Sequence, residues 1–527
     1  MARINRRAVV AGVGASALAG PAAAALPPIA AGRTKVVFIS DVHIGDNSPT
    51  VWYQKDFHEP FLIALLDHVI GQAGEVRELI ILGDFVDYWT YPPRRRPPGL
   101  REIAAANPAI FGPRGKLAQA LSALKGRVTW IPGNHDMGVT QRDVDFLVSR
   151  EGYRIQVRDE EAYFPLAPDR RLACSHGHRW TMFNAPDPST PLAPLPLGHF
   201  VTRSVAYMLD RDLPPGRSVA DLPDQGAPNG IELTKLAGAI NGSLIESAVN
   251  YAVKATGITE AEPILLPDGR TTNLGEVKLN YQGLWARWTT AVGGDLSAAK
   301  AAAADVNGRY LAWFAQRLAL QNGAELVVFG HTHAPKSGLK DGFINYVNTG
   351  FDCPSRPDIG TKHPTFIEVD TTTLTPRLRQ VTARPDGTYA IEDHSAPADT
   401  LVYAPNFDFS TYVTVDNSQG TADLIRRTSV EVHGRYVVGP PAVIPKGHVT
   451  RFWIQDNAGT RGSEGVATYD RAGGAPVDLR FGCPTGTVSN FASGAAFQAR
   501  VGGKDWGPPN VAPKLGHPLF VRFRVTP

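Results

Sequence analysis

Acidic, amide and imidazole side chains recur in five short motifs of the sequence, which together contain six of its 14 histidines. The motifs are, in chain order, Asp41-Val42-His43, Gly83-Asp84-Phe85-Val86-Asp87, Gly133-Asn134-His135-Asp136, Ser175-His176-Gly177-His178 and Gly330-His331-Thr332-His333. Carboxylate and imidazole donors suit divalent ions such as Zn, Fe, Mn or Ni. The chemistry that these residue types favour is therefore metal binding.

The spacing inside the motifs supports the same interpretation. Residues two apart in an extended segment point to the same side, so Asp41 and His43 form one pair of donors, and His331 and His333 form another. The carboxylate of Asp84 is able to bridge two ions about 3.5–4 Å apart, the separation found in two-metal sites. Glycines beside the donors allow sharp turns of the backbone. The sequence thus predicts a centre of two divalent ions, whose identity stays open.

The motifs are placed by strands that alternate with helices from residue 34 onward. Apolar residues at helical spacing predict a helix over residues 57–72. Alternating strands and helices are typical of a layered α/β domain, in which the loops at the carboxyl ends of strands converge on one crevice. We therefore expect the five motifs to meet at one place. Short apolar runs predict the buried strands at residues 35–40, 78–82, 127–131, 171–175 and 325–329.

Two regions depart from this alternation. Residues 186–228 are rich in Pro and are expected to form loops, and helices are expected at 233–255, 283–290 and 297–321. We interpret residues 186–321 as a helical insertion that either caps the motif loops or packs outside the core. After residue 385, short strand-like segments are separated by Gly, Pro, Asn and Asp, which is typical of an all-β sandwich. The expected units are a domain at 32–385, a linker at 386–407 and a β-sandwich at 408–527.

The N-terminus, residues 1–31, has the order of an export signal of the twin-arginine type. Arg6-Arg7 precedes the apolar stretch Ala8–Leu18, and the small residues Ala23 and Ala25 follow. We expect export to a periplasm, a cell surface or the medium, with an uncleaved membrane anchor as the alternative.

Cleavage of this signal would remove three Arg and no acidic residue, which leaves 50 basic and 50 acidic residues. This charge balance gives no reason to expect nucleic-acid binding, and three cysteines are too few for a disulfide scaffold.

The order and spacing of the five motifs resemble the calcineurin-like metallophosphoesterase family over about residues 35–370. The resemblance implies a layered β-sandwich core flanked by helices. It implies His135 as general acid, with Asp136 orienting and polarising its ring. Asp87 stays open as a ligand or a supporting residue, and His178 is the alternative to His176. The implied ligands are Asp41, His43, Asp84 and His333 for the first ion, and Asp84, Asn134, His176 and His331 for the second.

The C-terminal residues 408–527 contain four distinctive segments, which are Phe452-Trp-Ile-Gln-Asp-Asn457, Gly462-Ser-Glu-Gly465, Phe481-Gly-Cys-Pro-Thr-Gly486 and Asp505-Trp506. In these segments the chain resembles aegerolysin-like β-sandwich proteins. Members of that family often bind lipids or membranes, so the resemblance implies a lipid surface as a partner of this domain. The alternative is a passive sandwich that stabilises or spaces the enzyme.

Together these resemblances imply a metal-dependent phosphoesterase. It would hydrolyse a phosphomonoester, a phosphodiester or a pyrophosphate, on a lipid-linked or nucleotide substrate, by attack of a water that bridges the two ions. The sequence contains neither a G-x-S-x-G motif nor a P-loop that would offer another route. The competing hypothesis is a secreted lipid-binding protein with a vestigial phosphoesterase domain.

Overall fold

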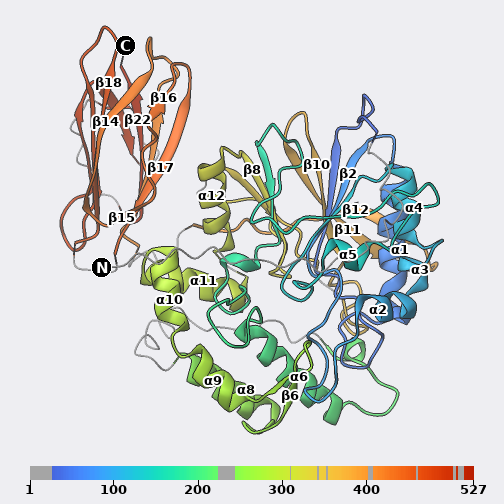
Figure 1. The fold of residues 1–527 in the computed structure, drawn as a ribbon. Coiled ribbons are helices and arrows are strands. Elements are labelled where there is room, and N and C mark those ends of the chain that lie inside the picture. The colour runs from blue at the N-terminus through green and yellow to red at the C-terminus, as the bar shows by residue number, and fades with distance from the viewer. Residues whose placement is uncertain are drawn as a thin grey trace, which may run out of the picture.

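The computed structural model describes residues 27–526, apart from 224–243, 309, 341–342, 352–353, 402–407, 458–460, 502–505 and 508–515. Most of the expected export signal therefore lies outside the described residues, as do parts of the expected linker and of the helix expected at 233–255. In the described part of the chain, no helix combines the length and apolar character needed to cross a membrane. The described elements form an α/β domain, a helical insertion and a β-sandwich (Figure 1).

Two sheets pack face to face at the centre of the α/β domain. The larger has the strand order β12-β11-β10-β1-β2-β3-β4, and the smaller has the order β5-β8-β9. Strands β1, β2 and β3 are parallel to one another, as are β5 and β8, so the carboxyl ends within each set lie at the same edge. The strands are β1 (Lys35–Ile39), β2 (Val76–Leu82), β3 (Val128–Ile131), β4 (Gln156–Val157), β5 (Leu172–Cys174), β8 (Leu326–Phe329), β9 (Asn345–Asn348), β10 (Thr365–Asp370), β11 (Thr375–Ala383) and β12 (Tyr389–Asp393).

Alternating side chains of these strands fill two separate cores. Val36 and Phe38 of β1 pack with Val328 of β8 between the sheets, whereas Val37 and Ile39 face the helices on the outside. The outer face of the larger sheet is covered by helices, and α12 (Leu311–Asn322) covers the smaller sheet. The layered sandwich flanked by helices is therefore confirmed. The other helices of this domain are α1 (Lys55–Gly71), α2 (Leu100–Ala106), α3 (Pro108–Phe111), α4 (Lys116–Ala123) and α5 (Gln141–Val144).

The insertion contains more helix than the sequence suggests. The prediction of loops across residues 186–228 is wrong for α6, because Pro196 and Pro214 flank this helix rather than interrupt it. The single helix expected at 297–321 is divided into α11 and α12, because Gly308 and Tyr310 adopt left-handed φ values of 61° and 65°. The insertion contains α6 (Leu197–Asp212), α8 (Leu244–Thr256), α9 (Leu274–Tyr281), α10 (Leu284–Val292), α11 (Asp295–Asn307), the short helix η2 (Val219–Asp221), and the hairpin β6 (Ile264–Leu265) and β7 (Thr271–Thr272). The short helix η1 (His178–Trp180) precedes it.

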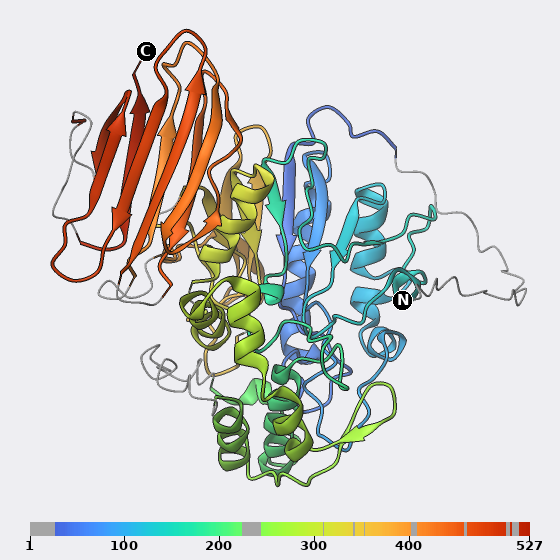
Figure 2. The same cartoon turned by 60° about the vertical axis from the view of Figure 1, so that its left-hand side comes forward.

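The C-terminal domain is the expected β-sandwich, built from two five-stranded sheets with the orders β15-β17-β13-β22-β21 and β16-β14-β18-β19-β20. It stands beside α12 (Figure 2), where the ring centroids of Trp453 and Trp313 lie 5.5 Å apart. Strand β12 falls in the range expected for the linker, so the first domain extends to Asp393. The strands are β13 (Thr411–Asp416), β14 (Leu424–His433), β15 (Arg435–Val438), β16 (Val443–Ile444), β17 (Val449–Gln455), β18 (Ser463–Arg471), β19 (Val477–Cys483), β20 (Phe491–Ala495), β21 (Phe497–Val501) and β22 (Leu519–Val525).

Candidate metal centre

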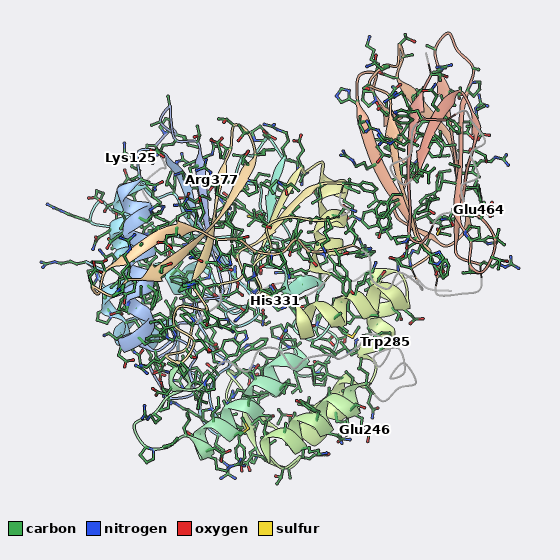
Figure 3. The ribbon with its side chains drawn as sticks, turned by 180° about the vertical axis from the view of Figure 1, so that it is seen from behind. Lys125, Glu246, Trp285, His331, Arg377 and Glu464 are labelled. Carbon is green, nitrogen blue, oxygen red and sulfur yellow. The ribbon has the colours of Figure 1, made fainter. Side chains whose placement is uncertain are left out.

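The five motif loops meet at one edge of the packed sheets, as expected. Each loop follows the carboxyl end of a strand, in the order β1, β2, β3, β5 and β8. Figure 3 shows His331, from the last loop, between the strands of the core and the insertion helices. Six of the seven predicted donor residues are buried, and the side chain of His333 alone among the seven keeps a substantial exposure, 30%. The predicted donors thus share one secluded place.

The backbone of these loops is strained where the donors stand. Left-handed φ angles are uncommon for residues other than Gly, and each costs on the order of 1 kcal/mol. Hydrogen bonds between the loops hold this conformation, for example from His43 N to Asp84 O at 2.8 Å. Such strain is typical of functional sites, where surrounding structure fixes an unfavourable conformation. The donors with left-handed φ are Asp41 (56°), His43 (56°), Asp84 (51°), His331 (73°) and His333 (50°).

One cluster of donors is formed by Asp41, His43 and His333, with Asp84 close by. The Nε2 atoms of His43 and His333 lie 3.0 Å apart. His333 Nε2 lies 3.6 Å from Asp41 Oδ1, and His43 Nε2 lies 3.9 Å from Asp84 Oδ2. The donor atoms of Asp41, His43 and His333 are close enough together to hold a single ion, and Asp84 is grouped in the same way with His43 and His135.

A second cluster lies on the other side of Asp84. His176 Nε2 is 3.2 Å from Asp84 Oδ2 and 3.2 Å from Asn134 Oδ1. His331 Nδ1 is 3.0 Å from the same Asn134 oxygen. Asp84 Oδ2 therefore faces both clusters, which is the position of a bridging carboxylate.

Hydrogen bonds on the outer side of the imidazoles determine which ring nitrogen faces inward. Where the outer nitrogen donates to an oxygen, the inner nitrogen carries a lone pair. Inside the clusters, the inner nitrogens face acceptor oxygens and one another, an arrangement that a bound cation, or a proton on the imidazole, makes favourable. The donor set thus fits divalent metal ions. The outer bonds run from His43 Nδ1 to Asp87 Oδ2 (2.9 Å), from His176 Nδ1 to the carbonyl oxygen of Leu82 (2.7 Å), and from His331 Nε2 to Thr181 Oγ1 (3.1 Å) and Asp305 Oδ1 (3.3 Å).

The electrostatics of the second cluster also favour positive charge. Burial lowers the pKa of His176, but the carboxylates of Asp84 and Asp41 outweigh this effect and raise it to about 9. Burial raises the pKa of Asp84, but His176 and His135 outweigh burial and hold it well below its usual range. The site therefore keeps an ionised carboxylate at its centre, which attracts cations.

His135 stands beside the first cluster and is held by Asp87. Its Nδ1 lies 3.0 Å from Asp87 Oδ2, and its ring stacks on Trp89 with centroids 4.3 Å apart. Burial lowers the pKa of His135, but the carboxylates of Asp87 and Asp84 raise it by more than burial lowers it. The net shift of the pKa is therefore upward. Asp87 Oδ2 also accepts from His43, while its Oδ1 accepts from the backbone of Trp89 (2.7 Å) and Thr90 (3.0 Å). One buried carboxylate thus orients both a donor imidazole and the predicted acid.

The role expected for Asp136 needs correction. Its carboxylate accepts hydrogen bonds from Trp130 Nε1 (3.0 Å) and from the backbone nitrogens of Asp84 (3.1 Å), Phe85 (3.0 Å) and Gly133 (2.6 Å). These bonds fasten the second and third motif loops together, and the His135 ring is oriented by Asp87 instead. The side chain of Asp136 points away from the His135 ring, toward Trp130 and the backbone of the motif loops. The side chain of Asp87 points toward the imidazole.

His178, the alternative to His176, is placed behind the clusters. Its ring centroid is 5.3 Å from that of His176 and 6.5 Å from that of His331. Neither of its ring nitrogens has a hydrogen-bond partner among the described residues. Burial lowers the pKa of His178 well below its usual value, so the ring is neutral. The geometry therefore assigns the donor position to His176.

Two residues outside the motifs also belong to the site. Asp305 of α11 accepts from His331, from the Phe183 backbone nitrogen and from Asn184 Nδ2 (2.7 Å). Trp52 packs its ring against His43, with centroids 4.5 Å apart. Asp305 follows a run of alanines and Trp52 lies in a loop, so neither carries a sequence signal beyond its residue type.

Comparisons with known proteins bear on the first part of the chain. Residues 34–199 match the model of the calcineurin-like phosphoesterase family, and no curated protein matches the chain. Among solved structures, a dimetal phosphatase from Danio rerio is similar at 13% identity and a TM-score of 0.25, over 69% of this chain and 99% of that one. The lipid binding protein Nakanori is similar at 11% identity and a TM-score of 0.18, over 23% of this chain and 71% of that one. The family model therefore matches residues 34–199 to the calcineurin-like phosphoesterase family, which is the family that the five motifs resemble.

Proposed function

We propose that this chain is a phosphoesterase that uses two divalent ions sharing Asp84. The observation that carries the proposal is the pair of donor clusters on either side of this carboxylate, with imidazole lone pairs directed into both. Nitrogen and oxygen donors of this kind suit Zn, Fe, Mn or Ni. One ion would be held by Asp41, His43, Asp84 and His333, and the other by Asp84, Asn134, His176 and His331.

The chain's own residues then supply positioning and a proton. When bound, the ions would withdraw charge from the phosphate group and acidify a water. His135, with Nδ1 held by Asp87, has Nε2 left to donate. As the bond between phosphorus and the ester oxygen breaks, the proton of His135 moves to that oxygen and the alcohol leaves. The water releases a proton to solvent as its oxygen forms the new bond to phosphorus, and solvent returns a proton to the imidazole.

A lipid-binding protein with a vestigial phosphoesterase domain is the competing hypothesis. A vestigial site would be expected to lack donors, whereas all seven are present and gathered into two clusters. We retain a lipid surface as a partner of the β-sandwich, and export through residues 1–31, as proposals that rest on the sequence.

The test combines metal analysis with turnover of bis-p-nitrophenyl phosphate. The wild type should bind two ions per chain and hydrolyse this diester. Asp84→Asn should reduce turnover about 1,000-fold or more and lower the metal content, because a shared ligand is lost from both clusters. Asp393→Asn, which changes an exposed carboxylate on β12 (78% side-chain exposure), is the matched control and should behave as the wild type. A wild type that binds no metal and hydrolyses neither mono- nor diesters would refute the proposal.

A further inference from the structure

A cavity of about 90 Å³ lies beside the metal centre, between the loop that follows β1 and helix α6 of the insertion. Trp52 forms the wall that the cavity shares with the metal centre. The centroid of its ring lies 4.5 Å from that of His43 and 5.4 Å from those of His135 and His333. Thr90 also lines the cavity and is next in the chain to Trp89, which stacks on His135, so the cavity lies near the His135 side of the site.

The opposite wall is an apolar stripe of α6. Val201, Val205 and Leu209 recur every four residues, so they lie on one face of the helix, and all three line the cavity. Val205 is 36% exposed, which leaves the cavity accessible from solvent. An apolar helix face left open beside a polar centre suits a ligand with an apolar part.

The cavity is built from anchored parts. Arg203 of α6 is buried, and its guanidinium donates to the carbonyl oxygens of Pro92 (2.9 Å), Pro93 (2.8 Å), Arg95 (2.8 Å) and Leu265 (3.1 Å). These bonds tie the helix to the loop that follows Thr90. His199, one turn before, packs edge-on against Trp89, which itself stacks on His135. The apolar stripe therefore holds a fixed position relative to the predicted acid.

We propose that this cavity binds the apolar part of the alcohol that leaves the phosphate ester. The inference rests on the proposed function, in which His135 protonates the leaving oxygen and the carbon chain of the alcohol departs on the His135 side. At about 90 Å³ the cavity is smaller than the roughly 150 Å³ cavity that holds benzene, so it suits an alkyl chain of about three or four carbons rather than a ring.

Calorimetry of the Mn-loaded protein with methylphosphonate and butylphosphonate tests the proposal without turnover. Each buried methylene contributes about a fourfold gain in affinity, so butylphosphonate should bind at least about tenfold more tightly. The ratio of kcat/KM for butyl phosphate over methyl phosphate should rise similarly. Val205→Asp should bring both ratios close to one, because it places a charge in the apolar wall, and Leu209→Gln serves as a milder second variant.

The matched control is Leu279→Asp on α9, where the side chain is 67% exposed and distant from the cavity walls. It should keep the wild-type ratios. Binding of both phosphonates with equal affinity, or a preference for butylphosphonate that survives Val205→Asp and Leu209→Gln, would overturn the cavity assignment alone. Failure of the wild type to bind either phosphonate, with no turnover of any ester, would instead overturn the proposed function.

Discussion

The two donor clusters receive their support from different parts of the molecule. The cluster around His43 and His333 is supported by Asp87, which belongs to the same loop as Asp84. The cluster around His331 is supported by Asp305, which lies on α11 of the insertion (Figure 1). The comparison indicates that the insertion supports the donor set, because α11 supplies the carboxylate that lies beside the outer nitrogen of His331, next to the Thr181 hydroxyl.

The two supporting carboxylates also differ in what else they contact. Asp87 Oδ2 faces two imidazoles, those of His43 and His135, so it joins the metal centre to the proton donor. Asp305 faces one imidazole, and its carboxylate also accepts hydrogen bonds from the Phe183 backbone and the Asn184 side chain. These two bonds hold the segment at the start of the insertion. Loss of Asp87 should therefore affect chemistry and metal binding together, whereas loss of Asp305 should affect mainly metal binding.

The largest expected effect is that of Asp87→Asn. If the amide oxygen keeps the backbone bonds of Trp89 and Thr90, the amide nitrogen faces the N–H groups of His43 and His135, and both rings must change tautomer. We expect kcat for alkyl phosphates to fall about 100- to 1,000-fold. Esters of p-nitrophenol should slow less, because their leaving group needs no proton. Steady-state kinetics on both ester classes measures this difference.

The Asp87→Asn result can break the comparison in two ways. Equal slowing of alkyl and p-nitrophenyl esters, with metal content unchanged, would contradict the assignment of His135 as the acid. Full activity on alkyl phosphates would show that neither imidazole depends on Asp87. The control is again Asp393→Asn, which removes a charge at a distant edge strand.

The second expected effect is that of Asp305→Asn. Removing the charge behind a ligating imidazole typically costs about 10- to 100-fold in metal affinity. We expect loss of metal from the variant during dialysis against a weak chelator, with activity restored by excess metal. Elemental analysis before and after dialysis gives a readout that does not depend on turnover.

Glu246→Gln is the matched control for Asp305→Asn. It neutralises an exposed carboxylate on α8 of the same insertion, far from the centre (Figure 3). If both variants retain metal equally, the insertion is only packed against the centre and the contrast between the two clusters disappears. If Asp305→Asn alone loses metal, the insertion is part of the centre.

The difference between the clusters also explains how far the sequence alone could predict this site. The donors could be predicted because each sits directly after a buried strand, and strand ends converge by topology. Asp305 could not, because its contact with His331 depends on how α11 packs, and an acidic residue in an Ala-rich helix is ordinarily a solvated one. The prediction that Asp136 orients His135 is wrong, because adjacency in sequence does not determine the direction in which a side chain points from a turn.

The fold shows the same division between local and long-range information. The strands at 35–39 and 326–329 were predicted within a residue or two, because a buried strand leaves a continuous apolar run. Helix α6 was missed because the Pro content around it outweighed its own apolar spacing. The cavity between Trp52 and α6 could not be foreseen at all, since it exists only where two unrelated segments face each other.

The smallest expected effect concerns the loss of stability at acid pH near the loop that carries Trp52, the residue that lines the cavity. His58 lies in the first turn of α1, beside this loop: its Nδ1 accepts from Gln54 N (2.8 Å) and its Nε2 donates to the Pro354 carbonyl oxygen (2.7 Å). Burial lowers the pKa of His58 to about 4. Because the folded pKa lies below the unfolded one, the unfolded chain binds more protons between about pH 6.5 and pH 4. The stability from neutral His58 is thus complete above pH 6.5 and declines as the pH falls.

Between pH 7 and pH 5.5 this loss amounts to about 1 kcal/mol. His58→Gln should remove it, because Gln can replace the two hydrogen bonds without titrating. Urea unfolding of the wild type and variant at both pH values measures the difference, and the change with pH should be smaller in the variant by about that amount. A variant with the same pH dependence as the wild type would mean that the Trp52 wall does not rest on a neutral His58. Acid sensitivity near this cluster would then have to come from the donor imidazoles themselves.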